Sequence, residues 1–273
     1  MASPIWIRNL IKRTFSQRFF LSRLTRVPPV GRLLDKALFD GDDLIILPKN
    51  DVIQVNRALE SPEDTVLPSR VVEHFIKEAH YHWIMDACIC RESSHCKDYP
   101  VDLGCLFLGK ATQGINPKFG RPVSAEEALL HVERCREAGL VHLVGRNKLD
   151  SVWLNVRPGN ELFTICNCCP CCCLWKVLPH MSTRISSKVT KMPGVSVFVT
   201  GQCIGCGTCT KNICFANAIR LEGDRAVIGN GCRGCGRCVE SCPQNAIHIR
   251  ITDESFVSRT IGRLSDLVDV SQR

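Results

Sequence analysis

The chain is poor in aromatic residues and has no long apolar run. Phe, Trp and Tyr together make up 6% of its 273 residues, and tyrosine occurs only twice. A helix that spans a membrane needs about 20 consecutive apolar residues, and the sequence offers no such stretch. We also find no secretory signal. A reducing, cytoplasmic location without disulfides is therefore expected.

Acidic residues are missing from the first 34 residues, which carry seven Lys or Arg. Subtracting these seven from the formal net charge of +8 leaves +1 for the rest of the chain. That count treats every cysteine as neutral, so thiolates bound to metal would make the folded remainder acidic. The basic balance is thus a property of the N-terminal segment, and no nucleic-acid partner is expected.

Cysteine is abundant, with 19 residues, and eight of them form two runs near the C-terminal end. The runs are Cys203, Cys206, Cys209 and Cys214, and then Cys232, Cys235, Cys238 and Cys242, which Pro243 follows. Three thiolates with two residues between neighbours can wrap one iron–sulfur cubane. The fourth cysteine lies too far along the chain to close the same site, so it ligates the other cluster. The spacing therefore predicts two [4Fe–4S] sites. One takes Cys203, Cys206, Cys209 and Cys242, and the other takes Cys232, Cys235, Cys238 and Cys214.

These motifs resemble a bacterial-type two-[4Fe–4S] ferredoxin domain over about residues 195–252. An internal repeat agrees, because Asn217-Ala218-Ile219 matches Asn245-Ala246-Ile247. The first half differs from the family in one extra residue before Cys214 and in Phe215, where the family has proline. The resemblance implies a ferredoxin-like fold that passes single electrons between two adjacent clusters. Zinc is the alternative, but zinc ribbons use two separated cysteine pairs rather than triplets.

Ten further cysteines lie in two N-terminal groups. They are Cys88, Cys90, Cys96 and Cys105, followed by Cys166, Cys168, Cys169, Cys171, Cys172 and Cys173. Neighbouring residues point apart, so the second group cannot all face one metal. We expect at least one additional Fe–S cluster. One site would use Cys88, Cys90, Cys96 and Cys105, and a mixed site would use Cys166, Cys168 or Cys169, and Cys172. Zinc and unligated buried thiols remain alternatives. The nineteenth cysteine, Cys135, is expected in the core.

The expected fold class is α+β, with a C-terminal ferredoxin-like two-cluster domain and an N-terminal mixed α/β cysteine-rich module. The predicted segments are a basic helix over 1–34, the cysteine-rich module over 35–180, a linker over 181–194, the ferredoxin domain over 195–252 and a tail over 253–273.

Local patterns predict the elements of the module. Strands are expected over 44–47, 52–55 and 195–199. A helix capped by Ser69 is expected over 69–85, and its histidines are expected to be solvated or hydrogen-bonded rather than metal ligands. Ser124 opens a capping box for a helix that ends at Ala138 before Gly139. A hairpin is expected with strands over 151–156 and 161–166.

Residues 4–26 combine basic and apolar side chains and are expected to be helical. Such a helix suits a membrane surface, a partner subunit, a mitochondrial transit peptide, or packing on its own domain. Peripheral membrane attachment or subunit docking through this segment is the favoured interpretation.

We interpret the chain as an electron carrier or an electron-transfer subunit of anaerobic metabolism, with redox proteins as partners. No hydrolase triad and no flavin or nicotinamide motif is evident. Two alternatives remain: an iron–sulfur oxidoreductase with a catalytic N-terminal cluster, and an assembly protein that uses metal only for structure.

Overall fold

The computed structural model describes residues 3–50, 53–54, 67–253 and 255–272. It contains both helices and strands, as the α+β class requires. The α-helices are α1 Ile5–Thr14, α2 Arg18–Leu24, α3 Pro28–Leu34, α4 Ser69–Glu78, α5 Ile89–Ser93, α6 Ala125–Glu137, α7 Lys148–Leu154, α8 Thr183–Ser186, α9 Arg237–Glu240 and α10 Phe256–Ser265. The strands are β1 Asp43–Ile46, β2 Ile53–Gln54, β3 His82–Met85, β4 Leu106–Leu108, β5 Gly120–Val123, β6 Val141–Arg146, β7 Phe163–Cys168, β8 Val189–Lys191, β9 Val195–Val199, β10 Ile219–Glu222, β11 Arg225–Ile228 and β12 Ile247–Ile251.

The N-terminal part is built on one sheet, which has seven strands in the described residues in the order β5-β3-β4-β7-β6-β1-β8. All neighbours pair antiparallel except β1 and β8, which run parallel. The central strands β4, β6 and β7 are almost wholly buried, because helices and long loops cover both faces. β7 ends at Cys168, so the second cysteine group spans the end of this central strand and the turn that follows it.

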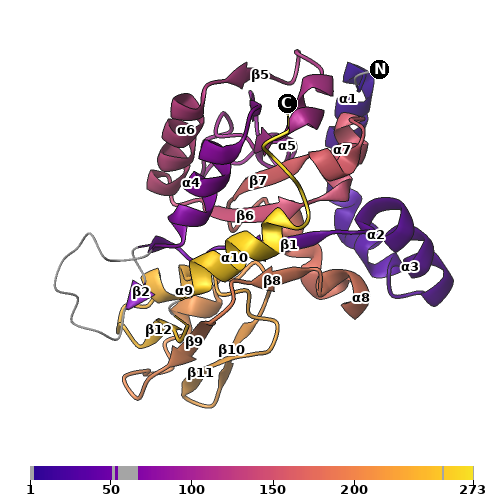
Figure 1. Cartoon of the computed structure of the whole chain (residues 1–273). Coiled ribbons are helices and arrows are strands. Elements are labelled where there is room, and N and C mark those ends of the chain that lie inside the picture. Colours follow the sequence, from indigo (N-terminus) through magenta and orange to yellow (C-terminus); the bar gives the residue numbers. More distant parts are fainter. Residues whose placement is uncertain (1–2, 51–52, 55–66, 254, 273) are drawn as a thin grey trace.

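The C-terminal part lies below this sheet in Figure 1 and contains two small sheets. β9 pairs with β12, and β10 pairs with β11, both antiparallel. The predicted strand over 195–199 is confirmed as β9. β2 adds to β12 in parallel, which ties the N-terminal part to this sheet. The predicted strand over 52–55 is thus observed at Ile53–Gln54, and its end residues lie outside the described part of the chain.

One hydrophobic core joins the two parts. It contains Phe75 of α4, Ile45 of β1 and Ile249 of β12, with Phe256 and Leu264 of α10. Figure 1 shows α10 lying across the junction between the large sheet and the C-terminal strands. The predicted tail therefore forms a helix that contributes to the shared core.

The predicted linker over 181–194 holds secondary structure of its own. It contains α8 and also β8, the strand that closes the edge of the large sheet against β1. Ile185 and Val189 are 1% exposed, so this segment is packed against the N-terminal part.

The helix predicted over 69–85 is wrong in its second half. It ends at Glu78, because Ala79 adopts an extended backbone, and residues 82–85 form β3 between β4 and β5. The cross-strand pairing outweighs the helical pattern of the apolar residues. Ser69 does not cap the helix; its N–H bonds to Asn50 instead. His82 is hydrogen-bonded, with its ring nitrogen 2.7 Å from the carbonyl oxygen of Ile76.

The hairpin predicted over 151–166 is also wrong. Residues 151–154 belong to α7, and β7 pairs with β4 and β6 rather than with the segment before it. The apolar residues Val152 and Leu154 would fit a strand or a helix. Leu149 and Leu154 lie on the buried side of α7, so packing of the helix favours the second. The N-terminal cap is confirmed, because the Ser124 hydroxyl accepts the N–H of Glu127, and Gly139 follows the helix with φ +75°. The reciprocal half of the capping box is not seen, since the Glu127 carboxylate pairs with Arg121.

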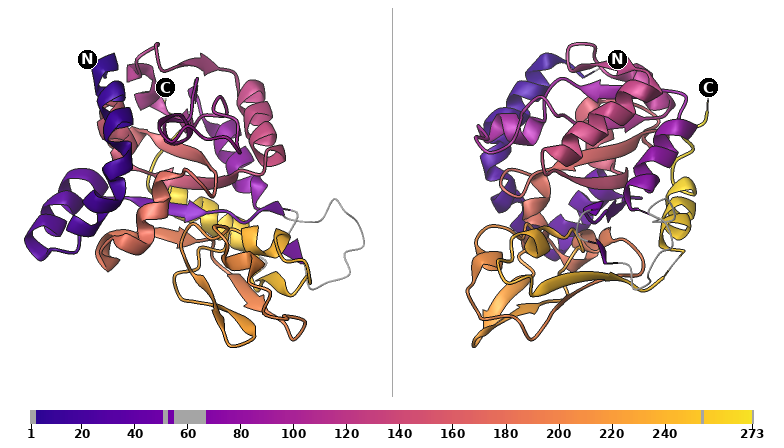
Figure 2. Two further views of the ribbon diagram at one scale, coloured as in Figure 1. Left: turned by 180° about the vertical axis from the view of Figure 1, so that it is seen from behind. Right: turned by 90° about the vertical axis from the view of Figure 1, so that its left-hand side faces the viewer.

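The basic segment is helical, as predicted, but in separate pieces. A 3-10 turn at Phe15–Gln17 separates α1 from α2. Val27 has an extended backbone, and α3 begins after it at Pro28. Phe15 is 4% exposed, so one side of the segment packs on the chain itself. Two views show α2 and α3 projecting from the side of the molecule (Figures 1 and 2).

Candidate metal centres

The first C-terminal group of cysteines lines a single pocket. That pocket is formed by Cys203, Cys206, Cys209 and Cys242, with Ile204, Gly207, Leu221, Ala226, Pro243, Gln244 and Ile247. Cys206 is exposed, whereas Cys209 is buried. Burial raises the pKa of Cys209, and the nearby thiols of Cys242 and Cys203 raise it further. The four predicted ligands of one cluster therefore lie together.

The second C-terminal group is more deeply placed. Burial raises the pKa of Cys238, and the neighbouring thiols of Cys235, Cys232 and Cys214 add to the rise. Cys232 likewise has Cys235 and Cys214 as its thiol neighbours. Cys214 thus comes from the first run and lies with the second run. Cys209 also acts on Cys238, so the two groups are adjacent.

The internal repeat has a structural purpose at the fourth cysteine of each run. Asn217 and Asn245 both take a left-handed backbone, with φ of 48° and 47°. The N–H of the next alanine then points at sulfur: Ala218 donates to Cys214 and Ala246 to Cys242, each at 3.3 Å. N–H donors stabilise thiolate and tune bound clusters. The extra residue before Cys214 is absorbed by Asn212, which has φ 58°.

A cavity in the N-terminal part is surrounded by sulfur. Its described lining contains Cys88, Cys90, Cys105, Cys166, Cys168 and Cys173, and also Cys169. We call the first six the cavity cysteines. Cys166 and Cys168 lie two apart on β7 and so share one face of the strand. The Sγ atoms of Cys105 and Cys166 are 3.7 Å apart.

Several of the cavity cysteines contact one another, and these contacts change their pKa values. Contact with the Cys105 thiol and then with Cys168 raises the pKa of Cys166, and burial adds to that rise. The contacts with Cys166 and Cys173 lower the pKa of Cys168, although burial opposes this. Cys168 therefore gives up its proton more readily than an ordinary cysteine, and thiolate is the form that binds metal.

Four other cysteines form a compact group: Cys96, Cys169, Cys171 and Cys172. Their Sγ atoms all lie within 4.8 Å of one another, and no other described set of three or more His, Cys, Asp or Glu is that close. The Sγ atoms of Cys96 and Cys171 are 3.6 Å apart, and those of Cys171 and Cys172 are 3.5 Å apart. Cys172 also donates its N–H to the sulfur of Cys169 at 3.3 Å.

The second cysteine group is thus divided between two places. Cys166, Cys168 and Cys173 face the cavity, while Cys169, Cys171 and Cys172 turn to Cys96. The structure places Cys96 apart from Cys88, Cys90 and Cys105, with which the spacing had grouped it. Sequence reasoning did not select Cys171 and Cys173. The turn after Cys168 breaks the alternation of faces, and the sequence alone carries no signal for which of the following cysteines faces which site.

Arg91 is a fully buried cation between these cysteines. It is 0% exposed, and its guanidinium donates to the carbonyl oxygens of Asn167 and Leu103. Burial alone would lower its pKa, but the nearby thiols of Cys88 and Cys169 raise it. Its Nε has no hydrogen-bond partner. A buried cation is costly unless it is paired, so Arg91 fits negatively charged centres on its two sides.

The N-terminal and C-terminal cysteines meet in one apolar cluster. Phe215, Val189 and Trp175 form part of its core, and Cys166, Cys168, Cys214, Cys232 and Cys235 pack against it. The backbone N–H of Lys49 also donates to the carbonyl oxygen of Cys235 at 3.2 Å. The cavity and the second C-terminal group are therefore neighbours across a buried apolar cluster.

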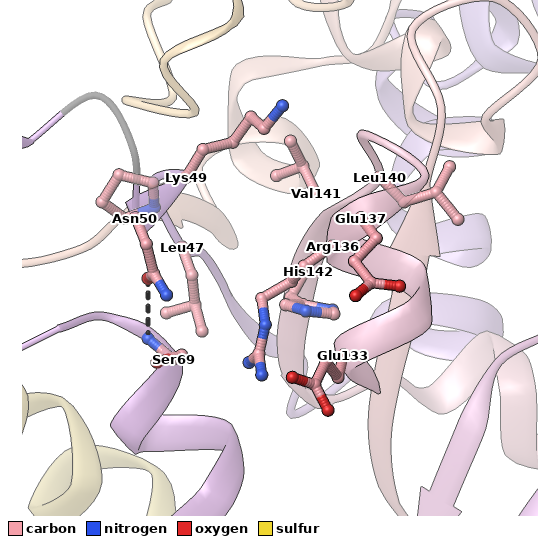
Figure 3. A pocket seen from close by; sticks show the side chains of 11 residues that line it. Leu47, Lys49, Asn50, Ser69, Glu133, Arg136, Glu137, Leu140, Val141 and His142 are labelled. Carbon is pink, nitrogen blue, oxygen red and sulfur yellow. Dashed lines mark hydrogen bonds between the residues drawn. The ribbon is translucent and has the colours of Figure 1, made fainter. Parts of the chain in front are cut away.

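A pocket of about 320 Å³ lies away from the cavity (Figure 3). Arg136, Glu133 and Glu137 of α6 and the following His142 line one side of it, and its described lining contains no cysteine. Burial lowers the pKa of His142 to about 4, and the Nδ1 of His142 is hydrogen-bonded to the Oδ1 of Asn167 at 2.9 Å. This histidine is therefore neutral and hydrogen-bonded, and the pocket offers no constellation that binds a metal.

Cys135 is buried in the core, as predicted, with 0% exposure. Burial raises the pKa of its thiol to about 12, so this cysteine stays protonated beside the compact group.

Comparison with known proteins gives one match. Residues 227–248 match the family model of the 4Fe-4S binding domain (Fer4), and this segment contains Cys232, Cys235, Cys238 and Cys242. Searches of curated proteins and of solved structures found no match. The chain therefore contains a 4Fe-4S binding domain, which implies at least one [4Fe–4S] cluster and an iron–sulfur role in electron transfer. Among the described residues, no helix has both the length and the apolar character needed to cross a bilayer.

Proposed function

We propose that the protein is a two-cluster ferredoxin-like electron carrier, or the electron-transfer subunit of an oxidoreductase, with at least one more cluster in its N-terminal part. Cys203, Cys206, Cys209 and Cys242 would hold one C-terminal cluster, and Cys232, Cys235, Cys238 and Cys214 the other. The cavity cysteines would hold the N-terminal cluster. Such clusters, when bound, take up and release single electrons.

The shared apolar cluster around Phe215 and Trp175 carries this proposal. It brings Cys232 and Cys235 of one site close to Cys166 and Cys168 of another, because all four pack against the same buried apolar side chains. The chain would thus fix the spacing of the sites, exclude water and supply N–H donors to sulfur, which are the means by which a protein tunes clusters.

A redox protein would dock at the exposed end of this arrangement. Cys206 is the exposed cysteine of the first group, and the apolar side chains beside it are open to solvent: Ile204 is 63% exposed and Leu221 is 40% exposed. Exposed apolar groups around a charged centre suit a transient protein contact. Electrons would then enter or leave at Cys206 and reach the buried sites through the second group.

The N-terminal helices would supply a second docking surface, on a membrane or a partner subunit. Trp6, Phe20 and Leu33 are 64%, 64% and 69% exposed, and Arg23 is exposed on α2, the helix that carries Phe20. Basic and aromatic side chains in this mixture suit an interface with anionic lipid. Replacing Phe20 and Leu33 with serine tests this without removing the packed side of the helices. If the double variant fractionates and co-purifies like the wild type, this surface has no such role.

Anaerobic purification with iron and acid-labile sulfide analysis tests the main proposal. About eight irons per chain would leave only the two C-terminal clusters, whereas about twelve or more support an N-terminal cluster. The double variant Cys105→Ser, Cys166→Ser should lose that extra iron and keep the C-terminal signals in redox-poised EPR. Cys135→Ala is the matched control and should keep all iron. Protein that contains zinc but no iron would refute the proposal.

One observation favours the oxidoreductase alternative. An apolar pocket under α1 is lined by Arg8, Ile11, Phe107 and Phe119, and it shares Cys105, Asp150 and Trp153 with the cavity. Burial raises the pKa of Asp150 to about 6, against hydrogen bonds from Thr164 and Asn147. The pocket thus offers a small molecule a place beside the cavity and a carboxyl that can be protonated. Turnover of a small substrate with an artificial reductant, if it is lost in Asp150→Asn, would establish that the protein is an enzyme. An electron carrier would show no such turnover.

A further inference from the structure

The compact group differs in scale from the other cysteine sites. Its four sulfurs are mutually within 4.8 Å, with two of the pairs at 3.5 and 3.6 Å. Cys105 and Cys166 of the cavity are 3.7 Å apart as a pair, but no other set of three or more sulfurs in the described residues is mutually within 4.8 Å. The difference matters because the distance between sulfur ligands depends on whether they bind a single metal ion or an iron–sulfur cluster.

Four thiolates on one tetrahedral ion must lie close together. With a Zn–S bond of about 2.3 Å, tetrahedral geometry sets neighbouring sulfurs about 3.8 Å apart. In a [4Fe–4S] cluster each thiolate binds a different iron at a different corner of the cubane, so the sulfurs are held farther apart. The distances among Cys96, Cys171 and Cys172 match the first case.

We propose that Cys96, Cys169, Cys171 and Cys172 bind a single zinc ion, separate from every iron–sulfur site of the chain. Four sulfur ligands in a tetrahedron, with no water position, are the donor set of a structural zinc site. Cys169 and Cys172 are buried, and apolar Leu103 and Leu140 pack around the group, which excludes solvent from the ion.

The charge around the group suits this assignment. Four thiolates and one Zn²⁺ leave a net charge of about −2. Arg91 lies close enough to the Cys169 sulfur to have its pKa raised by it. Burial raises the pKa of Tyr99, the charge of Arg237 lowers it, and the thiols of Cys171 and Cys169 raise it. A second cation, Arg237, therefore lies near the group.

The zinc site would hold the turn that aims the cavity cysteines. Cys168 and Cys173 face the cavity, and the residues between them supply three of the four zinc ligands. Cys96 contributes the fourth from the loop after α5, whose start carries Cys88 and Cys90. One ion would therefore clamp together the two segments that line the cavity. This assignment does not rest on the electron-transfer proposal.

The test is elemental analysis of full-length protein purified anaerobically from medium that contains both iron and zinc. We expect about one zinc per chain in addition to the iron, and zinc K-edge EXAFS should show four sulfur ligands at about 2.3 Å. In Cys171→Ser, zinc should fall at least fivefold while the EPR signals of the C-terminal sites are unchanged. In Cys135→Ala, which removes a buried thiol beside the group, zinc should remain.

Two results would overturn the assignment. One is wild-type protein without zinc, or with zinc bound through nitrogen or oxygen. The other is a loss of iron and sulfide, rather than zinc, in Cys171→Ser, because it would make the group an iron–sulfur site. EXAFS on the wild type gives the answer even if the variant does not fold. Failure of the electron-transfer proposal looks different, since it would appear as missing iron in protein that keeps its zinc.

Discussion

Arg237 donates a hydrogen bond from its guanidinium to the backbone carbonyl oxygen of Cys168. Arg237 opens α9 directly after the Cys235-Gly236 turn, and Cys168 is the last residue of β7. Arg237 is 6% exposed, and its Nε and Nη1 have no hydrogen-bond partner. This contact fixes the second C-terminal group against the run of N-terminal cysteines.

Replacing Arg237 with Gln should loosen that junction. The carbonyl of Cys168 would lose its donor in a buried place, and such a loss costs about 1–3 kcal/mol. Anaerobic thermal unfolding should therefore show a lower midpoint, and hydrogen exchange should rise in β7 and α9. Arg220→Gln is the control, because Arg220 is paired with Glu222 on the surface and its side chain is 60% exposed. Equal effects of the two substitutions would contradict a structural role for the Arg237 contact.

Glu92 holds the first helix on the cysteine-rich part. It pairs with Arg8 and Lys12 of α1, each at 2.7 Å. Burial would raise its pKa, but the hydrogen bonds from Lys12 and Arg8 lower it overall. These groups are partly exposed, so the pairs together contribute on the order of 1 kcal/mol and are weakened by salt.

Glu92→Gln should therefore let α1 open more often and uncover the pocket lined by Arg8 and Ile11. We expect trypsin to cleave after Lys12 or Arg13 several times faster in the variant, and high salt should narrow the difference. Glu222→Gln removes a carboxylate from an exposed surface pair and should leave cleavage unchanged. A rate in Glu92→Gln that equals the wild-type rate would mean that apolar contacts alone hold α1.

The sequence indicated the C-terminal site better than the N-terminal one, for a physical reason. In the C-terminal runs two residues separate each of the first three cysteines from the next, and local turns bring each sulfur back to the same place. The long-range partners Cys214 and Cys242 are marked by the Asn-Ala-Ile repeat, which recurs in the structure as a left-handed asparagine and an N–H to sulfur. Local geometry determines this site, so local pattern can predict which residues gather there.

The N-terminal groups depend on contacts between distant segments. Cys96 meets Cys171 only because the loop after α5 and the turn after β7 are brought together by the large sheet. No local spacing encodes that meeting. The errors at residues 79–85 and 151–156 have the same origin, since strand partners decide between helix and strand for short apolar segments. Without the sheet order, neither the elements nor the partition of cysteines could be predicted.

The left-handed backbone at Asn245 gives a prediction about the C-terminal site. A β-branched residue pays about 1–2 kcal/mol to adopt this conformation, whereas glycine adopts it freely. Asn245→Val should misplace the N–H of Ala246, which bonds to Cys242 at 3.3 Å, and iron should be lost faster on exposure to chelator. Asn245→Gly should retain iron like the wild type. Loss of iron from the glycine variant as well would show that the asparagine side chain, not the backbone angle, is required.

Asp42 makes stability depend on pH. Its Oδ1 accepts the N–H of Lys148 at 2.7 Å, while its Oδ2 is buried without a partner. Burial raises the pKa of Asp42 to about 7 from an ordinary value of 3.8, although the Lys148 N–H and the charge of Lys188 oppose the rise. Between these two values the folded state keeps a proton that the unfolded state has lost. Stability should therefore decrease as pH rises from about 4 to about 7, by at most about 1.4 kcal/mol per pH unit.

Asp42→Asn removes this proton linkage and keeps an oxygen that can accept the N–H of Lys148. The stability of the variant relative to the wild type should rise by on the order of 2 kcal/mol between pH 5 and pH 7.5. Anaerobic thermal unfolding at the two pH values measures the change. Asp266→Asn, at an exposed position after α10, is the control and should follow the wild type at both values. If Asp42→Asn loses as much stability as the wild type between pH 5 and pH 7.5, the carboxyl is ionised throughout and its burial has no effect on folding.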